Sequence, residues 1–330
     1  MIKLHCNIGK MEKIYHVLSL DGGGIRGVFT ATILTKIEER LGGKKIGECF
    51  DLVAGTSTGG ILACLLLLPG EDGKPRFCAR DTLDFYLSNG AKIFDVSWSQ
   101  WIQSGAGIID EKYSSDNIKE LIDEYAKGVE LKDLIHDCLI TSYDTEKREI
   151  HLYKSHKARK DTTHNCLINE VALATSAAPT YFEPVLTSSN KCLIDGGMFA
   201  TNPSMCAFVE ARKLCPDKLP MMLSVGTGRE ERPYSYDDIK DYGLIEWIQP
   251  IIKILFGAGA DSTEYFTERM FRMNNQEDHY YRINVQLTKE EAEMDDTSSS
   301  NLRHLQKLAH EEFDRLDKLG VIDRLVQDLV

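Results

Sequence analysis

A serine between two glycines is the feature of this sequence with the clearest chemistry. Gly55, Ser57 and Gly59 form Gly-x-Ser-x-Gly, between an apolar segment at 50–54 and a second one at 60–68. A strand, a tight turn and a helix in this order are typical of a nucleophile elbow, since glycine lets the backbone turn sharply. We therefore expect the Ser57 hydroxyl to be a nucleophile, held beside a helix N-terminus that favours negative charge. A glycine-rich turn without chemistry is the alternative.

A glycine run follows an earlier apolar segment at 15–20. It is Asp21-Gly22-Gly23-Gly24-Ile25-Arg26-Gly27, and a segment with helical spacing comes after it. Three of its glycines fit the dinucleotide pattern G-x-G-x-x-G, but that fingerprint also needs an acidic residue at the end of the second strand. Here the second strand runs into Ser57, so we expect no nucleotide cofactor. The run suits an oxyanion hole instead, because consecutive N–H groups without side chains can point at a negatively charged oxygen.

An aspartate follows a third short apolar segment. Residues 192–194 are expected to form a strand that ends in Asp195, before two glycines. Asp195 thus takes a position equivalent to those of Asp21 and Ser57, just past a strand. Ligands and catalytic groups gather at the carboxyl ends of strands in α/β sheets, which makes Asp195 a candidate site residue.

The composition limits the class of protein. The chain has 330 residues, 42% of them hydrophobic, which suffices for one large domain or two small ones. Its net charge of −12 argues against general nucleic-acid binding. Nine cysteines without a Cys-x-x-Cys pair favour free thiols in a reducing cytosol over disulfides or a zinc site. Residues 1–13 lack the apolar core of a signal peptide, and Met11 is as good a start as Met1.

The longest apolar run, 61–68, is far shorter than the ~20 residues of a membrane span, so we expect a cytoplasmic protein that is at most peripheral to membranes. Strands are expected at 15–20, 50–54, 138–143, 149–153, 192–194, 221–225 and 280–287, with a hairpin over 138–153. Helices are expected at 28–41, 60–68, 81–89, 114–126, 167–175, 203–214, 244–256, 262–271, 301–319 and 321–330. No repeat or linker is evident, so one α/β domain is the simpler interpretation.

Three motifs together resemble the patatin-like phospholipase family of plant storage acyl hydrolases and their bacterial relatives. They lie at 21–27, 55–59 and 195–197, and further segments similar to plant patatins follow the same order at 176–182, 224–228 and 293–298. The resemblance covers residues 15–300. It leaves 1–14 as an N-terminal extension and 301–330 as a C-terminal helical extension packed on the same domain.

The resemblance implies a three-layer α/β/α fold with a mainly parallel sheet, and a phospholipase A type reaction without metal or cofactor. Fatty-acyl esters of phospholipids at a membrane surface would be cleaved through an acyl-enzyme by a Ser57–Asp195 dyad. Because an aspartate of ordinary pKa, about 3.9, is a weak base, an apolar pocket must raise that pKa. The resemblance also implies that Gly22, Gly23 and Gly24 form the oxyanion hole and that Arg26 supports it. The backbone N–H of Thr58 is one further candidate donor.

Several alternatives stay open. An ordinary α/β-hydrolase triad would need a late histidine, for which His279 is best placed by chain order, and a storage or binding protein would need none. The resemblance also allows a bacterial phospholipase switched on by a small molecule such as a cyclic nucleotide. The segment with Trp98 and Trp101 suits a membrane flap or ordinary core packing. The basic run at 154–160 suits a solvated loop or contact with anionic headgroups.

Overall fold

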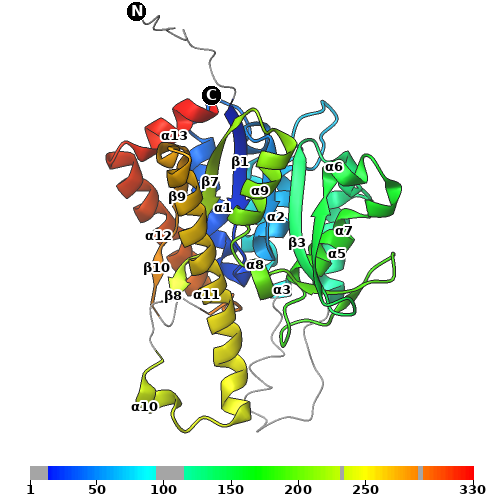
Figure 1. Ribbon diagram of the computed structural model, residues 1–330, viewed down its shortest axis with the longest axis vertical. Helices are drawn as coiled ribbons and strands as arrows, with labels where there is room; N and C mark the ends of the chain where they lie inside the picture. The colour runs from blue at the N-terminus through cyan, green and yellow to red at the C-terminus, as the bar shows by residue number, and fades with distance from the viewer. Residues whose placement is uncertain (1–13, 94–114, 231–233, 289–292) are drawn as a thin grey trace, which may run out of the picture.

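The computed structural model describes residues 14–93, 115–230, 234–288 and 293–330. Its centre is an eight-stranded sheet in which hydrogen-bonded neighbours follow the path β5-β6-β3-β2-β1-β7-β9, with β4 also paired to β3 (Figure 1). The neighbouring pairs among β3, β2, β1, β7 and β9 are parallel, and the pairs that involve β4, β5 and β6 are antiparallel. The strands are β1 (Ile14–Leu20), β2 (Leu52–Gly55), β3 (Asp137–Asp144), β4 (Glu149–Lys154), β5 (Val185–Leu186), β6 (Cys192–Asp195), β7 (Leu219–Val225) and β9 (Tyr280–Ile283).

Helices cover both faces of this sheet, because successive strand residues point to opposite sides. Leu18 and Val53 face a core shared with α1, α2, α3, α5, α7 and α12, whereas Val17 and Leu52 face α9 and α11. The expected three-layer α/β/α fold is confirmed. The longer helices are α1 (Gly27–Glu38), α2 (Thr58–Leu66), α3 (Ala79–Ile93), α5 (Ser115–Ala126), α7 (Ile168–Ser176), α9 (Ser204–Leu214), α11 (Leu244–Met273), α12 (Ser299–Lys318) and α13 (Val321–Leu329).

Helix α11 corrects one prediction. Two separate helices are expected from the sequence, at 244–256 and 262–271, yet residues 244–273 form one helix. The C-terminal half of α11 packs on α9: Phe271 is fully buried against Phe208, and Thr267 hydrogen-bonds to Ser204. Its N-terminal half extends below the body in Figure 1.

Two other segments also differ from expectation. The expected strand at 280–287 is two strands, because β10 (Gln286–Leu287) leaves the main sheet to pair with β8 (Arg229–Glu230). The basic run is not a simple loop: α6 (Ser155–Ala158) lies within it, and Lys154 forms a buried ion pair with Glu210. Lys157, Arg159 and Lys160 are exposed, as in a solvated segment. The segment with Trp98 and Trp101 lies outside the described residues.

Two further features follow from the described residues. The eight cysteines among them are unpaired. Among the described residues, no helix has both the length and the hydropathy that crossing a bilayer requires.

Candidate active site

Ser57 occupies a strained turn between β2 and α2. Its backbone angles are φ 53° and ψ −125°, a region that non-glycine residues rarely adopt. The turn is fixed on both sides: the Ser57 N–H donates to the Thr175 hydroxyl at 2.9 Å, and a Cβ on Gly59 would lie 2.2 Å from the Leu20 carbonyl oxygen. Strain at this serine and the need for glycine beside it are the marks of a nucleophile elbow.

Asp195 reaches the same place from the opposite direction. On one side of β3, β2 pairs in parallel up to Gly55 opposite Ile140, and β6 pairs antiparallel down to Asp195 opposite Ser142. The other side of β3 is occupied by β4. Thus β2 and β6 lie on the same side of β3 and run toward each other. Asp195 ends a short strand, as expected, but β6 is antiparallel to β3, whereas β1 and β2 belong to the parallel part of the sheet. The residue still arrives level with the elbow because β6 pairs only with the end of β3.

The Asp195 carboxyl group is buried and lines the same cavity as Ser57. It is 1% exposed and accepts the Gly197 N–H at 2.6 Å. Burial raises the pKa of Asp195 to about 7, although the Gly197 N–H and the Ser57 side chain favour the charged form. A base whose pKa lies near neutral pH is well matched to accept a serine proton.

The glycine run forms the wall of the site, but only part of it is free to bind an anion. Gly22 cannot donate as expected, because its N–H is already bonded to the Thr201 carbonyl at 2.8 Å. The Gly23 and Gly24 N–H groups have no acceptor among the described residues, and Gly24 has φ +61°. Arg26 supports the run by donating from Nε to the Gly23 carbonyl at 3.2 Å. Two N–H groups of this run therefore remain as candidate oxyanion donors.

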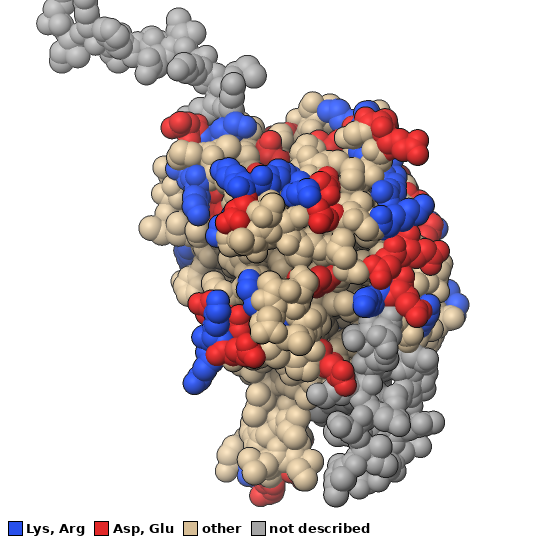
Figure 2. All heavy atoms as spheres, turned by 90° about the vertical axis from the view of Figure 1, so that its right-hand side faces the viewer, with Lys and Arg blue, Asp and Glu red and all other residues tan. Residues whose placement is uncertain are grey.

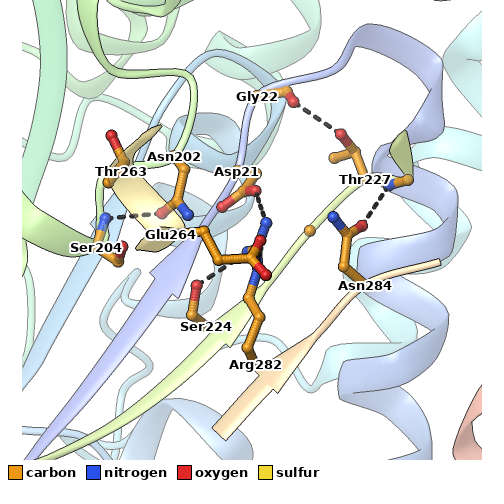
Figure 3. Close-up of polar contacts among 12 residues, drawn as sticks. Asp21, Gly22, Asn202, Ser204, Ser224, Thr227, Thr263, Glu264, Arg282 and Asn284 are labelled. Atoms are coloured by element: carbon orange, nitrogen blue, oxygen red, sulfur yellow. Dashed lines mark hydrogen bonds and ion pairs between the residues drawn. The ribbon is translucent and has the colours of Figure 1, made fainter. Parts of the chain in front are cut away.

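Three contacts that the motifs do not reveal hold the glycine run in place. The Thr227 hydroxyl donates to the Gly22 carbonyl at 2.8 Å, and the Ile25 N–H donates to the Met294 carbonyl at 2.8 Å (Figure 3 shows the first contact). Asp21, just before the run, is held by Arg282 of β9 at 2.7 Å. Thr227 and Met294 fall in the segments at 224–228 and 293–298, whose resemblance to plant patatins was the available signal.

The Asp21–Arg282 pair belongs to a larger buried cluster. Figure 3 shows Arg282 reaching Asp21, Glu264 of α11 and Ser224 of β7. Burial raises the pKa of Asp21 to about 6, although Arg282 favours its charged form. The cluster ties β1, β7, β9 and α11 together directly behind the glycine run.

A cavity of about 50 Å³ lies over the two candidate catalytic residues. Ser57, Asp195 and the three glycines of the run line it, and its other walls are mainly apolar, including Ile61, Ile93, Ile118, Phe182, Phe256 and Met294. Arg26 does not line it but faces a neighbouring cavity of about 290 Å³. The enclosed apolar walls are the cause of the raised Asp195 pKa.

The candidate triad histidine lies elsewhere. His279 immediately precedes β9, which is parallel to β7, so it lies at the amino end of the sheet, while Ser57 lies at the carboxyl end. Its imidazole is 3.9 Å from Asp328 of α13. No described histidine lines the cavity over Ser57. Within the described residues, no three His, Cys, Asp or Glu side chains are arranged to hold a metal ion.

Comparison with known proteins matches this sequence to a family. The family described as "Patatin-like phospholipase" matches residues 18–207. Patatin-like protein 4 of Arabidopsis thaliana is 29% identical over 92% of this chain and 84% of its own length, and Patatin-like protein 1 of the same plant is 30% identical over 88% and 80%. A potato relative from Solanum tuberosum, named "Probable inactive patatin-3-Kuras 1", is 26% identical over 87% and 83%.

Proposed function

Because this chain belongs to the patatin-like phospholipase family, we propose that it is a lipid acyl hydrolase of phospholipase A type, with Ser57 as nucleophile and Asp195 as base. One observation carries the proposal: a strained serine and a buried carboxyl group whose pKa is raised to about 7 line the same small, mainly apolar cavity. A family name alone would not suffice, since one potato relative is named inactive. This chain has the serine, the aspartate and two free N–H donors together.

The first half of the reaction forms an acyl-enzyme. Ser57 Oγ attacks the carbonyl carbon of a fatty-acyl ester while its proton passes to the Asp195 carboxylate. The carbonyl oxygen becomes negative and is stabilised by the Gly23 and Gly24 N–H groups, with the Thr58 N–H at the start of α2 as a third donor. When the oxyanion collapses, the ester C–O bond breaks, and Asp195 returns the proton to the leaving lysolipid oxygen.

The second half releases the fatty acid. Water attacks the acyl carbon and gives a proton to Asp195. The Ser57 C–O bond then breaks, and Asp195 passes that proton back to Ser57 Oγ. The apolar walls of the cavity suit the few carbons of the acyl chain next to the ester and keep Asp195 desolvated, so substrate binding itself sustains the basicity that the reaction needs. We propose that the enzyme acts at the cytoplasmic surface of a membrane. Activation by a small molecule such as a cyclic nucleotide is a separate proposal.

Product analysis tests the function. Purified wild-type protein and Ser57→Ala are incubated with a mixed panel of phospholipids, with and without cyclic nucleotides, and products are measured by mass spectrometry. The proposal predicts lysolipid and fatty acid in equal amounts from the wild type and neither from Ser57→Ala. Absence of both products from folded wild-type protein under every condition would favour a storage or binding role. Equal product from both proteins would place the chemistry elsewhere.

A further inference from the structure

The N-terminal half of α11 carries an exposed apolar stripe. Six large aliphatic side chains of this half are between 41% and 92% exposed: Leu244, Ile245, Ile248, Ile251, Ile254 and Leu255. Leu244, Ile248, Ile251 and Leu255 follow the i, i+4, i+7, i+11 spacing that places residues on one helix face. We call these four residues the α11 stripe.

Charge is kept away from this stripe. Between 244 and 256 only Glu246 and Lys253 are charged, and helical spacing places both on the opposite face. Glu246 caps the helix by accepting the Gly243 N–H, and Lys253 is paired with Glu293. In Figure 2 the part of the molecule below the body is mostly uncharged, with charged side chains at its tip. A solvent-facing stripe without charge suits burial in an apolar phase.

The stripe lies at the same end of the molecule as the candidate active site, and α11 also contributes a residue to the wall of that site. In Figure 1 β1 runs downward, so its carboxyl end, where the glycine run begins, faces the end from which α11 projects. Phe256 closes this half of the helix and lines the cavity over Ser57, and Ile254 lines the neighbouring cavity that Arg26 faces. A surface that contacts the stripe therefore lies next to both cavities.

We propose that the α11 stripe docks this enzyme on a lipid bilayer. The inference rests on the proposed function, because a phospholipase must reach esters that lie just below the bilayer surface. Amphipathic helices enter that boundary by their apolar face, and α11 is held rigidly at its other half by Phe271 and Thr267. The chain carries a net charge of −12, so attraction to anionic lipid is not the driving force. Binding should depend on apolar insertion and resist salt.

Vesicle binding by an inactive protein separates docking from catalysis. Ser57→Ala and Ser57→Ala with Ile248→Ser and Ile251→Ser are sedimented with phosphatidylcholine vesicles at low and high salt. Loss of two aliphatic side chains should weaken binding by about tenfold or more at both salt concentrations. The matched control adds Leu319→Ser to Ser57→Ala; Leu319 is 60% exposed and follows α12, and its loss should leave binding unchanged. In the active chain, the stripe change should lower the ratio of vesicle to soluble-ester hydrolysis.

Three results would overturn docking by the stripe: unchanged vesicle binding in the double-serine variant, equal loss in the Leu319→Ser control, or conversion of a dimer to a monomer while vesicle binding persists. The last would make the stripe a contact between two copies. If wild-type protein hydrolyses neither vesicles nor a soluble ester, yet vesicle binding depends on the stripe, the proposed chemistry fails and the docking surface stands.

Discussion

The Ser57 side chain and the Asp195 carboxyl group line the same cavity, although the strands that lead to them run in opposite directions. Both strands lie on one side of β3, and they end at Ile140 and Ser142 of that strand. In the proposed function, this head-on arrangement brings the base to the nucleophile without a histidine. Burial of the carboxyl group is the main cause of its raised pKa.

The pH dependence of activity should report Asp195. Only the carboxylate can accept the serine proton, and the pKa of Asp195 is raised to about 7. We expect kcat/KM for a soluble ester to rise with pH and to be half-maximal near pH 7. An exposed aspartate would place the midpoint near about 4. A midpoint there would mean that Asp195 is not the titrating base.

The same burial should make Asp195 costly for stability at neutral pH. Because its folded-state pKa lies above its unfolded value, the folded chain binds more protons between about pH 4 and 7, and stability falls as pH rises through this window. Asp195→Asn should therefore have a higher Tm than the wild type at pH 8, with a smaller difference at pH 5. Asp21, whose pKa is raised to about 6, contributes in the same sense and leaves a residual slope. Identical pH profiles of Tm would contradict the raised pKa.

Gly24→Ala should remove most activity from a folded protein. An alanine there would have to adopt φ +61°, and its Cβ would lie 2.1 Å from the Met294 carbonyl oxygen. The glycine run must therefore shift, and its N–H donors move with it. Loss of one oxyanion donor costs about 10²–10³ in kcat. Gly42→Ala is the matched control, because Gly42 has φ +63° and open space around its Cβ. Near-normal turnover in folded Gly24→Ala would remove this glycine from the mechanism.

Thr227→Val tests whether the glycine run must be held to work. The change removes the hydroxyl that binds the Gly22 carbonyl with little change in volume. We expect kcat for a soluble ester to fall about tenfold with KM nearly constant, as for an interaction made only in the transition state. Thr227→Ser keeps the hydroxyl and should restore most of the rate. If both variants lose the same activity, the hydrogen bond is not the cause.

Arg282→Met should destabilise the fold strongly. The Arg282 and Asp21 side chains are 10% and 4% exposed, and breaking a buried pair costs about 3–5 kcal/mol because one charge is left unpaired. Arg272→Met is the matched control: it breaks the exposed pair with Glu268 and should cost less than about 1 kcal/mol. Adding Asp21→Asn to Arg282→Met should recover part of the loss. Equal denaturation midpoints for the two single variants would contradict this account of the cluster.

The local parts of the site could be predicted from the sequence, and the long-range parts could not. Gly-x-Ser-x-Gly between apolar segments dictates a turn within a few residues, so the strain at Ser57 follows from neighbours in the chain. The commitment of the Gly22 N–H to Thr201 depends on a residue far along the chain. The direction of β6 likewise depends on long-range pairing: β4 occupies one side of β3, and β6 pairs with the part of the other side that β2 does not reach. Arg282 shows no signal, since nothing in an alternating strand marks which charge will be buried.

Helix α11 shows the same limit from the other side. The sequence predicted two helices here, but helix ends are decided by packing, and Phe271 and Thr267 hold the second half of one continuous helix. The apolar character of 244–256 was visible in the sequence. That these side chains face solvent was not, because an apolar helical segment is ordinarily buried.

Phospholipid hydrolysis by a matched set of variants tests the central claim most directly. Ser57→Ala, Asp195→Asn and His279→Ala are each checked for folding and assayed on the same phospholipid vesicles. The dyad predicts near-complete loss of activity in the first two and a modest change in the third, since His279 lies at the opposite end of the sheet beside Asp328. If folded His279→Ala is as inactive as Ser57→Ala, or if Asp195→Asn keeps near wild-type turnover, the Ser57–Asp195 dyad is wrong.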